Sequence, residues 1–274
     1  NRNTTVNRTI YFDKDPPTVN LTGPAEGTVI DLGTTSSPKN LTVTGNASDD
    51  NQLVRVEVLI DGEVKHTITS SFNSISASLA PNPLPAGYHA ISLRAIDKTG
   101  KVTETPRVNV YLDKDAPAIQ LTNPATDGAV VDVKNGLKIE ANVTDGSGTV
   151  DRVEVRVDGV LKKTITSGFG AINTTVDVTG ISGSRRISMT AVDKFGKSFT
   201  LDRQVTFDRK NPWVAIFLPA TNGEIVDVKD GLRLEVRSTD DAGLASIEIY
   251  IDDVLHTTFT NKFYFDEYFN VSQI

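Results

Sequence analysis

The stretch VRVEVLIDGEVKHTIT, residues 54–69, decides the fold of this chain. Its first half alternates apolar and polar residues with the period of two that marks a half-buried β-strand. An Asp-Gly pair follows at residues 61–62, and this dipeptide tolerates the positive φ angles of a two-residue type I′ turn. The stretch therefore predicts a β-hairpin whose first strand turns these side chains toward a core: Val54, Val56, Val58 and Ile60.

The hairpin recurs twice along the chain, as VEVRVDGVLKKTIT (residues 153–166) and IEIYIDDVLHTTFT (residues 247–260). An acidic, Pro-containing stretch recurs with it: YFDKDPPTVNL at 11–21, YLDKDAPAIQL at 111–121 and TFDRKNPWVAIF at 206–217. Its leading aspartates, Asp13, Asp113 and Asp208, are separated by 100 and then 95 residues. A period of this length is that of a domain and not of a short solenoid repeat.

Further alternating runs flank each hairpin. The runs upstream place these residues inward: Leu41, Val43, Gly45 and Ala47; Leu137, Ile139, Ala141 and Val143; and Leu232, Leu234 and Val236. The runs downstream place these residues inward: Ile91, Leu93 and Ala95; and Ile187, Met189 and Ala191. About seven short strands with turn signals every 8 to 12 residues, and no helical period, predict an all-β protein of antiparallel sandwiches.

The repeated unit P-x-V-x-L-x-x-P, followed by V-x-V-x-x-D-G and A-x-D-x-x-G, resembles the bacterial immunoglobulin-like (Ig-like) domains found in tandem on prokaryotic surface proteins. The resemblance covers nearly the whole chain. It implies tandem Greek-key Ig-like β-sandwiches in a rod-like array, in an extracellular, cell-surface protein. The unit lacks the cysteine pair and core tryptophan of antibody domains, and Trp213 stands in a first strand instead, so antibody-type recognition is not implied.

The repeats predict four segments. Residues 1–14 match the closing strand of a unit, residues 15–114 and 115–209 form two Ig-like domains, and residues 210–274 form a third that lacks its last two strands. Two interpretations remain open. Either the chain is a piece of a longer array, or the closing strand of one copy completes the open third domain of another, because an unpaired sheet edge is a template for strand addition.

Composition excludes several partners. The chain has 274 residues and a formal net charge of −7, and it contains no cysteine. With a pI near 5.0 it has no basic surface for a nucleic acid, and no window of eighteen apolar residues predicts membrane insertion of this segment. Disulfides, thiolate zinc sites and cysteine nucleophiles are absent from the sequence.

Nothing in the sequence carries catalysis. It contains no nucleophile elbow, P-loop or paired-histidine metal motif, and its three histidines, His66, His89 and His256, lie on repeat strands, where we expect them at the surface. The prediction is therefore a protein that is not an enzyme and has no organic cofactor.

Acidic residues beside the prolines suggest a calcium site, since Ca²⁺ prefers six to eight oxygen ligands. The first candidate set is Asp13 and Asp15 with Asp97 or with Asp49 and Asp50, and the second is Asp113, Asp115, Asp145 and Asp193. The alternative is that Asp favours these turns while Pro16 and Pro117 stiffen the connection. At Asp208 we expect no calcium, because Arg209 and Lys210 follow and would repel the ion.

Asn-x-Ser/Thr sequons are more frequent than chance predicts, although threonine is also favoured on strands. The candidate glycosylation sites are Asn3, Asn7, Asn20, Asn40, Asn46, Asn142, Asn173 and Asn270. If these asparagines are glycosylated, the chain is extracellular.

Two functions fit the sequence. The first is a non-catalytic structural component of a surface assembly, such as an S-layer, surface filament or stalk, whose partners are other copies or further Ig-like domains of a longer chain. The second is an adhesin or a carbohydrate-binding accessory array. It would use exposed aromatic residues, which are densest in FYFDEYF at residues 263–269, where Phe263, Phe265 and Phe269 can alternatively be core.

Overall fold

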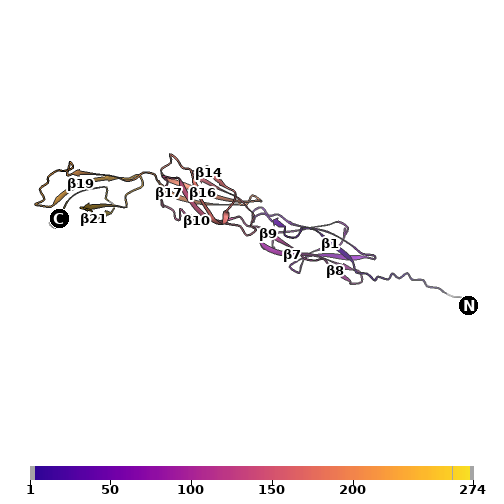
Figure 1. Cartoon of the computed structure of the whole chain (residues 1–274). Helices are drawn as coiled ribbons and strands as arrows, with labels where there is room; N and C mark the ends of the chain where they lie inside the picture. The colour runs from indigo at the N-terminus through magenta and orange to yellow at the C-terminus, as the bar shows by residue number, and fades with distance from the viewer. Residues whose placement is uncertain (1–3, 261, 272–274) are drawn as a thin grey trace. The chain divides into compact units, whose positions relative to one another are not determined.

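A computed structural model describes residues 4–260 and 262–271 of the chain (Figure 1). Regular structure within these residues is β-strand apart from one 3-10 turn, Phe169–Ala171. None of the described residues belongs to a helix long and apolar enough to cross a membrane. Two compact units divide the chain: Asn1–Ala118 with Thr144–Asp151 and Val192–Phe199, and Ile119–Val143 with Arg152–Ala191 and Thr200–Ile274.

The first repeat is an antiparallel sandwich. One sheet has the order β1-β3-β6, formed by Thr18–Gly23, Leu41–Ser48 and Ile75–Leu79. The other has the order β2-β9-β7-β4-β5, formed by Val29–Asp31, Val108–Asp113, Gly87–Asp97, Leu53–Ile60 and Glu63–Ile68, with β8 (Val102–Glu104) beside β7. Strand β2 runs parallel to β9, and the other pairings in this repeat are antiparallel.

The predicted hairpin is confirmed with one correction. Asp61 and Gly62 have φ angles of 55° and 84°, as a type I′ turn requires. Val54 is wrong as a core residue, because the register between β4 and β7 shifts between Leu53 and Arg55 and leaves Val54 42% exposed. A bulge of this kind interrupts the alternation on which the prediction depended.

The predicted inward residues form one continuous core in the first repeat. Leu41, Val43 and Ala47 from β3 meet Ile91 and Leu93 from β7 in the same buried cluster. Alternate side chains of two sheets interdigitate in this way in an aligned sandwich. Leu59, expected on the other face of β4, is also buried, at 2% exposure.

The second repeat has the same build. Its sheets have the orders β10-β12-β15 and β11-β17-β16-β13-β14. These strands are Ala118–Asn123, Leu137–Thr144, Ile172–Val176, Val130–Asp132, Ser198–Asp208, Gly183–Asp193, Val150–Val157 and Val160–Ile165. The inward residues predicted on β12 and β16 are buried, and Phe207 on β17 is fully buried beside them.

The third repeat contains the counterparts of five of these strands. Its two sheets have the order β18-β19-β22, formed by Trp213–Leu218, Leu232–Thr239 and Tyr264–Phe269, and β20-β21, formed by Ser246–Ile251 and Val254–Thr260. The Asp252-Asp253 turn takes φ angles of 49° and 62°, so it matches the Asp-Gly turns. The buried cluster includes Leu234, Val236 and Phe265, and the rings of Phe259 and Phe265 stack at 4.4 Å.

Candidate functional site: carboxylate clusters and a buried lysine

A buried lysine lies among three aspartates in the first compact unit. Lys197 Nζ lies 3.1 Å from Asp31 Oδ1, 3.2 Å from Asp113 Oδ2 and 3.1 Å from Asp193 Oδ2. Asp31 ends β2 and Asp113 ends β9, which are parallel neighbours and therefore bring both carboxylates to one sheet edge. Asp193 ends β16, and Lys197 closes the turn that follows. We call this set the Lys197 cluster.

The two aspartates from the first repeat respond differently to this environment. Burial alone would raise the pKa of Asp31, but hydrogen bonds from Lys39, the Gly33 amide and Lys197 outweigh it and lower that pKa. Burial raises the pKa of Asp113, despite the Lys197 ammonium and with a further contribution from the charge of Asp145. The Lys197 cluster contains three carboxylates and one ammonium group, and Lys39 adds a second cation at Asp31.

A second lysine occupies the same repeat position in the first repeat. The Lys101 ammonium contacts Asp13 Oδ1 at 2.5 Å and Asp97 Oδ2 at 3.4 Å, and its side chain is 30% exposed. In both repeats the lysine lies four residues after the aspartate, in the turns Asp97–Lys101 and Asp193–Lys197. These turns place an ammonium group between carboxylates that the sequence assigned to calcium.

The structure brings together most, but not all, of the predicted calcium ligands. Carboxylate oxygens of Asp13, Asp49 and Asp50 lie within 4.8 Å of one another, while Asp15 is exposed. In the second set, the Ser147 hydroxyl bridges Asp113 and Asp145, while Asp115 is exposed and meets Asp113 only through its backbone amide. Calcium at either set stays a prediction.

Asp31 was not anticipated from the sequence. A signal for it exists, because Val-Ile-Asp at 29–31 recurs as Val-Val-Asp at 130–132 and Ile-Val-Asp at 225–227. The parallel pairing that brings the first of these to Asp113 joins residues more than eighty positions apart, so no local pattern reveals it.

A third carboxylate cluster lies at Asp208, where oxygens of Asp208, Asp240 and Asp241 approach within 4.8 Å of one another. Arg209, expected to repel a cation here, donates to the carbonyl oxygens of Val178 and Ile181. Burial raises the pKa of Asp208, and the charges of Asp240 and Asp241 raise it further.

The raised pKa of Asp208 predicts that its ionisation destabilises the fold. The Asp208 carboxyl binds its proton more tightly in the folded protein than in the unfolded chain. The protein therefore loses stability as the pH rises through the unfolded and then the folded pKa of this group. We expect Asp208→Asn to raise the Tm at pH 7. The increase should become smaller as the pH falls toward the ordinary aspartate pKa of about 3.9. Asp202→Asn is the control of opposite sign, because Arg186 lowers the pKa of Asp202. Equal effects of both variants would contradict the prediction.

The expected surface placement of the histidines is wrong for His89. Its ring is 8% exposed, with Nδ1 2.6 Å from Asp61 Oδ2 and Nε2 3.2 Å from the Pro85 carbonyl oxygen. His66 and His256 are exposed, as predicted. The difference arises because the Asp61 turn accepts a hydrogen bond from the Ala90 amide, which brings β7 and the His89 ring against the turn.

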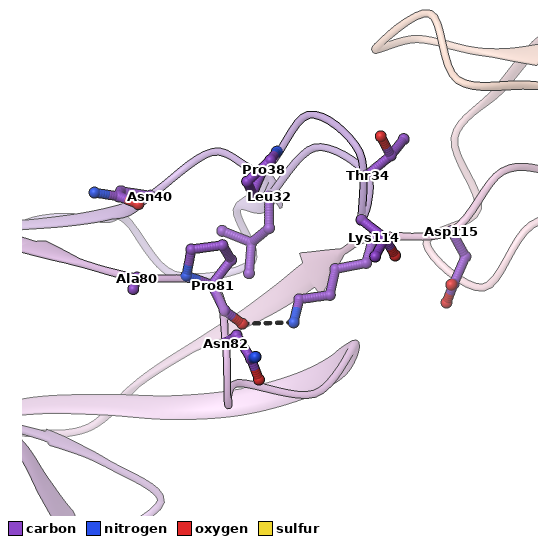
Figure 2. A pocket seen from close by; sticks show the side chains of 10 residues that line it. Leu32, Thr34, Pro38, Asn40, Ala80, Pro81, Asn82, Lys114 and Asp115 are labelled. Carbon is purple, nitrogen blue, oxygen red and sulfur yellow. Dashed lines mark hydrogen bonds between the residues drawn. The ribbon is translucent and has the colours of Figure 1, made fainter.

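A hollow of about 690 Å³ lies in the first repeat (Figure 2). The loop between β2 and β3 forms one wall and is longer than its counterpart in the second repeat, Val133 to Gly136. Lys114 also lines this hollow, and its ammonium donates hydrogen bonds to the carbonyl oxygens of Pro81, at 2.6 Å, and Leu84. Leu32, Thr34 and Asn82 add apolar and neutral polar groups, and the carboxylate of Asp115 also lines the hollow.

The sequons lie mostly on exposed positions. Asn46 is partly buried, Asn3 lies outside the described residues, and the remaining asparagines are exposed: Asn7, Asn20, Asn40, Asn142, Asn173 and Asn270. Glycosylation stays a prediction, which intact mass before and after deglycosylation tests.

An aromatic face covers one sheet of the third repeat. On β22, Phe265 is buried, Phe269 packs against the core, and Tyr264 and Tyr268 are 52% and 62% exposed. Arg237 pairs across the strands with Tyr264, and its guanidinium lies over the rings of Phe217, at 4.7 Å, and Tyr264, at 5.6 Å. The aromatic face is defined by Trp213, Phe217, Tyr264 and Tyr268, each more than 40% exposed.

The sequence of the first two repeats matches a known domain family. The family described as a bacterial Ig domain matches residues 17–93 and 117–191, which is more than half of the chain. The chain belongs to the bacterial Ig domain family. Its first two repeats are therefore bacterial Ig domains, as the resemblance of their motifs implied.

The comparison with solved structures finds matches of low sequence identity and low TM-score. The fibronectin(III)-like modules of Clostridium thermocellum CbhA are 19% identical, over 69% of this chain and 94% of theirs, with a TM-score of 0.32. A tetra-tandem repeat from the extending region of a large adhesion protein is 16% identical, over 81% and 56%, with a TM-score of 0.34. A structure of a 1.5-MDa bacterial ice-binding adhesin is 15% identical, over 93% and 87%, with a TM-score of 0.37. No curated protein matches the sequence significantly.

Proposed function

We propose that this chain is a non-catalytic structural part of an extracellular surface assembly, such as an S-layer, surface filament or stalk, in which bacterial Ig domains act as spacers. The observation that carries the proposal is the recurrence of one sandwich with short connections. Four residues, 114–117, connect β9 to β10, and four residues, 209–212, connect β17 to β18. Pro117 and Pro212 limit the backbone freedom of these connections.

The test uses the cells that make the protein. An antibody against residues 15–114 is expected to label intact cells, and excision of residues 115–209 from the full protein is expected to leave a shorter assembly in place. A control variant that destabilises the second repeat without removing it, Phe207→Ala, separates the effect of length from that of stability. Absence of surface labelling, or an assembly of unchanged dimensions after excision, would refute the proposal.

The aromatic face favours a second candidate, an adhesin or carbohydrate-binding accessory array. Exposed aromatic rings gathered on one sheet can stack on the apolar faces of sugar rings, and the neighbouring Arg237 and Asp266 can bind hydroxyl groups. Trp213 is the only tryptophan, so its fluorescence reports on this face alone. An oligosaccharide that changes this fluorescence in the wild type, and not in Tyr264→Ala, would support binding. A glycan panel without effect would exclude this candidate.

We infer that the partners are further Ig-like repeats, supplied by a longer chain or by other copies of this one. In the first repeat Val29, Ile30 and Asp31 pair in parallel with Tyr111, Leu112 and Asp113. The third-repeat counterparts, 225–227, form no strand, and Ile225 is 99% exposed. Residues 4–14 also form no strand, although their sequence matches the closing strand, and Ile10 and Phe12 are exposed.

Deleting residues 1–12 distinguishes the two sources of partners. If other copies supply the strand, the intact chain forms polymers in light scattering and the deletion abolishes them. Ile10→Ser with Phe12→Ser is expected to act like the deletion, because their counterparts Val110 and Leu112 are buried. Thr9→Ser with Tyr11→Ser is the matched control on the opposite strand face. Polymers that survive the deletion would show that copies associate without this strand, and an intact chain that stays monomeric would assign the partners to a longer chain.

A further inference from the structure

We propose that the Lys197 ammonium is the resident cation of the Lys197 cluster, and that it fastens the turn at 192–199 to strands β2 and β9 without a metal ion. The ammonium donates a hydrogen bond to Asp31 Oδ1 at 3.1 Å and forms ion pairs with Asp113 and Asp193. The oxygens lie 3.1 to 3.2 Å from Nζ, which is within the range of an ion pair. The inference does not depend on the proposed function.

Burial makes the lysine and a metal ion alternatives at this cluster. The side chain of Lys197 is 5% exposed, and those of Asp113 and Asp193 are 2% and 0% exposed. Buried charges persist only where opposite charges compensate them. A metal ion bound to the same oxygens would lie within a few ångströms of Nζ and be repelled by it.

The turn holds the ammonium in place. The Asp193 amide donates to the Lys197 carbonyl at 2.9 Å, and the Lys197 amide donates to Asp193 Oδ1 at 2.8 Å. The ammonium also lies 4.8 Å from the centre of the Phe195 ring. A closed turn and a ring contact both limit the rotamers through which the lysine could leave the cluster.

The charge balance indicates what removal of the lysine would do. Asp31, Asp113, Asp145 and Asp193 bring four carboxylates to the region, and Asp31 also pairs with Lys39. One buried oxygen of Asp145 has no hydrogen-bond partner. Without Lys197 the buried carboxylates would repel one another, and a divalent cation could take the vacated position.

Hydrogen exchange measured by mass spectrometry tests the proposal on the intact chain. The peptides to follow cover 29–33, 111–115 and 192–199. We expect the wild type to exchange equally in 2 mM EDTA and in 2 mM CaCl₂. Lys197→Met, which keeps most of the length of the side chain and removes its charge, is expected to exchange at least about tenfold faster in these peptides. Lys197→Gly is expected to exchange as fast as Lys197→Met in EDTA and to regain protection from exchange in CaCl₂.

Two control variants show whether the faster exchange depends on the burial of the lysine. Lys194→Met removes an exposed charge from the same turn and should change nothing. Lys101→Met should raise exchange less in its own turn, because Lys101 is more exposed and pairs with two carboxylates. EDTA that accelerates exchange in the wild type would overturn the proposal in favour of a bound metal. Unchanged exchange in Lys197→Met, or a Lys197→Gly variant that calcium does not protect, would also overturn it.

Discussion

Phe207→Ala is expected to destabilise the second repeat by about 3–5 kcal/mol. Phe207 is fully buried on β17, in the strand that pairs with both β11 and β16, so its ring cannot be replaced by water or by collapse of a loop. A domain of this size has a total stability of about 5–15 kcal/mol, so the loss is a large share of it. Thermal unfolding should show the transition of this repeat about 15 °C lower or more.

The matched control for Phe207 lies on the same strand. Phe199 is 43% exposed near the start of β17, and Phe199→Ala should change the stability by about 0.5 kcal/mol or less. The two variants lose the same atoms and differ only in burial. Similar shifts in the two variants would show that Phe207 is not part of a packed core.

Gly45→Ala is expected to destabilise the first repeat by about 2–3 kcal/mol. A Cβ at Gly45 would lie 2.4 Å from the Asn20 carbonyl oxygen and 2.5 Å from Leu93 Cδ1. The first contact is with the backbone of β1, which pairs with β3 at this point and cannot move away without breaking the ladder. Urea unfolding should show a lower midpoint with an unchanged m value.

Gly170→Ala is the control, since a Cβ at Gly170 would have no other heavy atom within 4 Å. Its expected effect is neutral or slightly stabilising, because alanine restricts the unfolded chain. Equal destabilisation by both substitutions would show that backbone entropy and not the contact with Asn20 is responsible.

The site was less predictable than the fold. The spacing of the aspartates and the Asp-x-x-Gly-Lys turns was visible in the sequence, but the role of Lys101 and Lys197 was not. Their ammonium groups occupy the position among the carboxylates that the sequence analysis assigned to calcium. A lysine four residues after an aspartate is common on protein surfaces, and only its burial against Asp31 and Asp113 sets Lys197 apart.

The sequence by itself determined the strands, the hairpin turns and the membership of the repeats, because alternation and Asp-Gly turns act between neighbours in the chain. Only the tertiary structure decided where the burial of a residue departs from the alternating pattern. Val54 leaves the core through a bulge, and His89 enters it through the Asp61 turn. Gly45 and its repeat counterpart Ala141 share one inward position. In the first repeat the Asn20 backbone and Leu93 occupy the space of a Cβ, whereas Ala141 buries one in the second repeat. Contacts of this kind join residues far apart in the chain, and a local pattern does not specify which of them will meet.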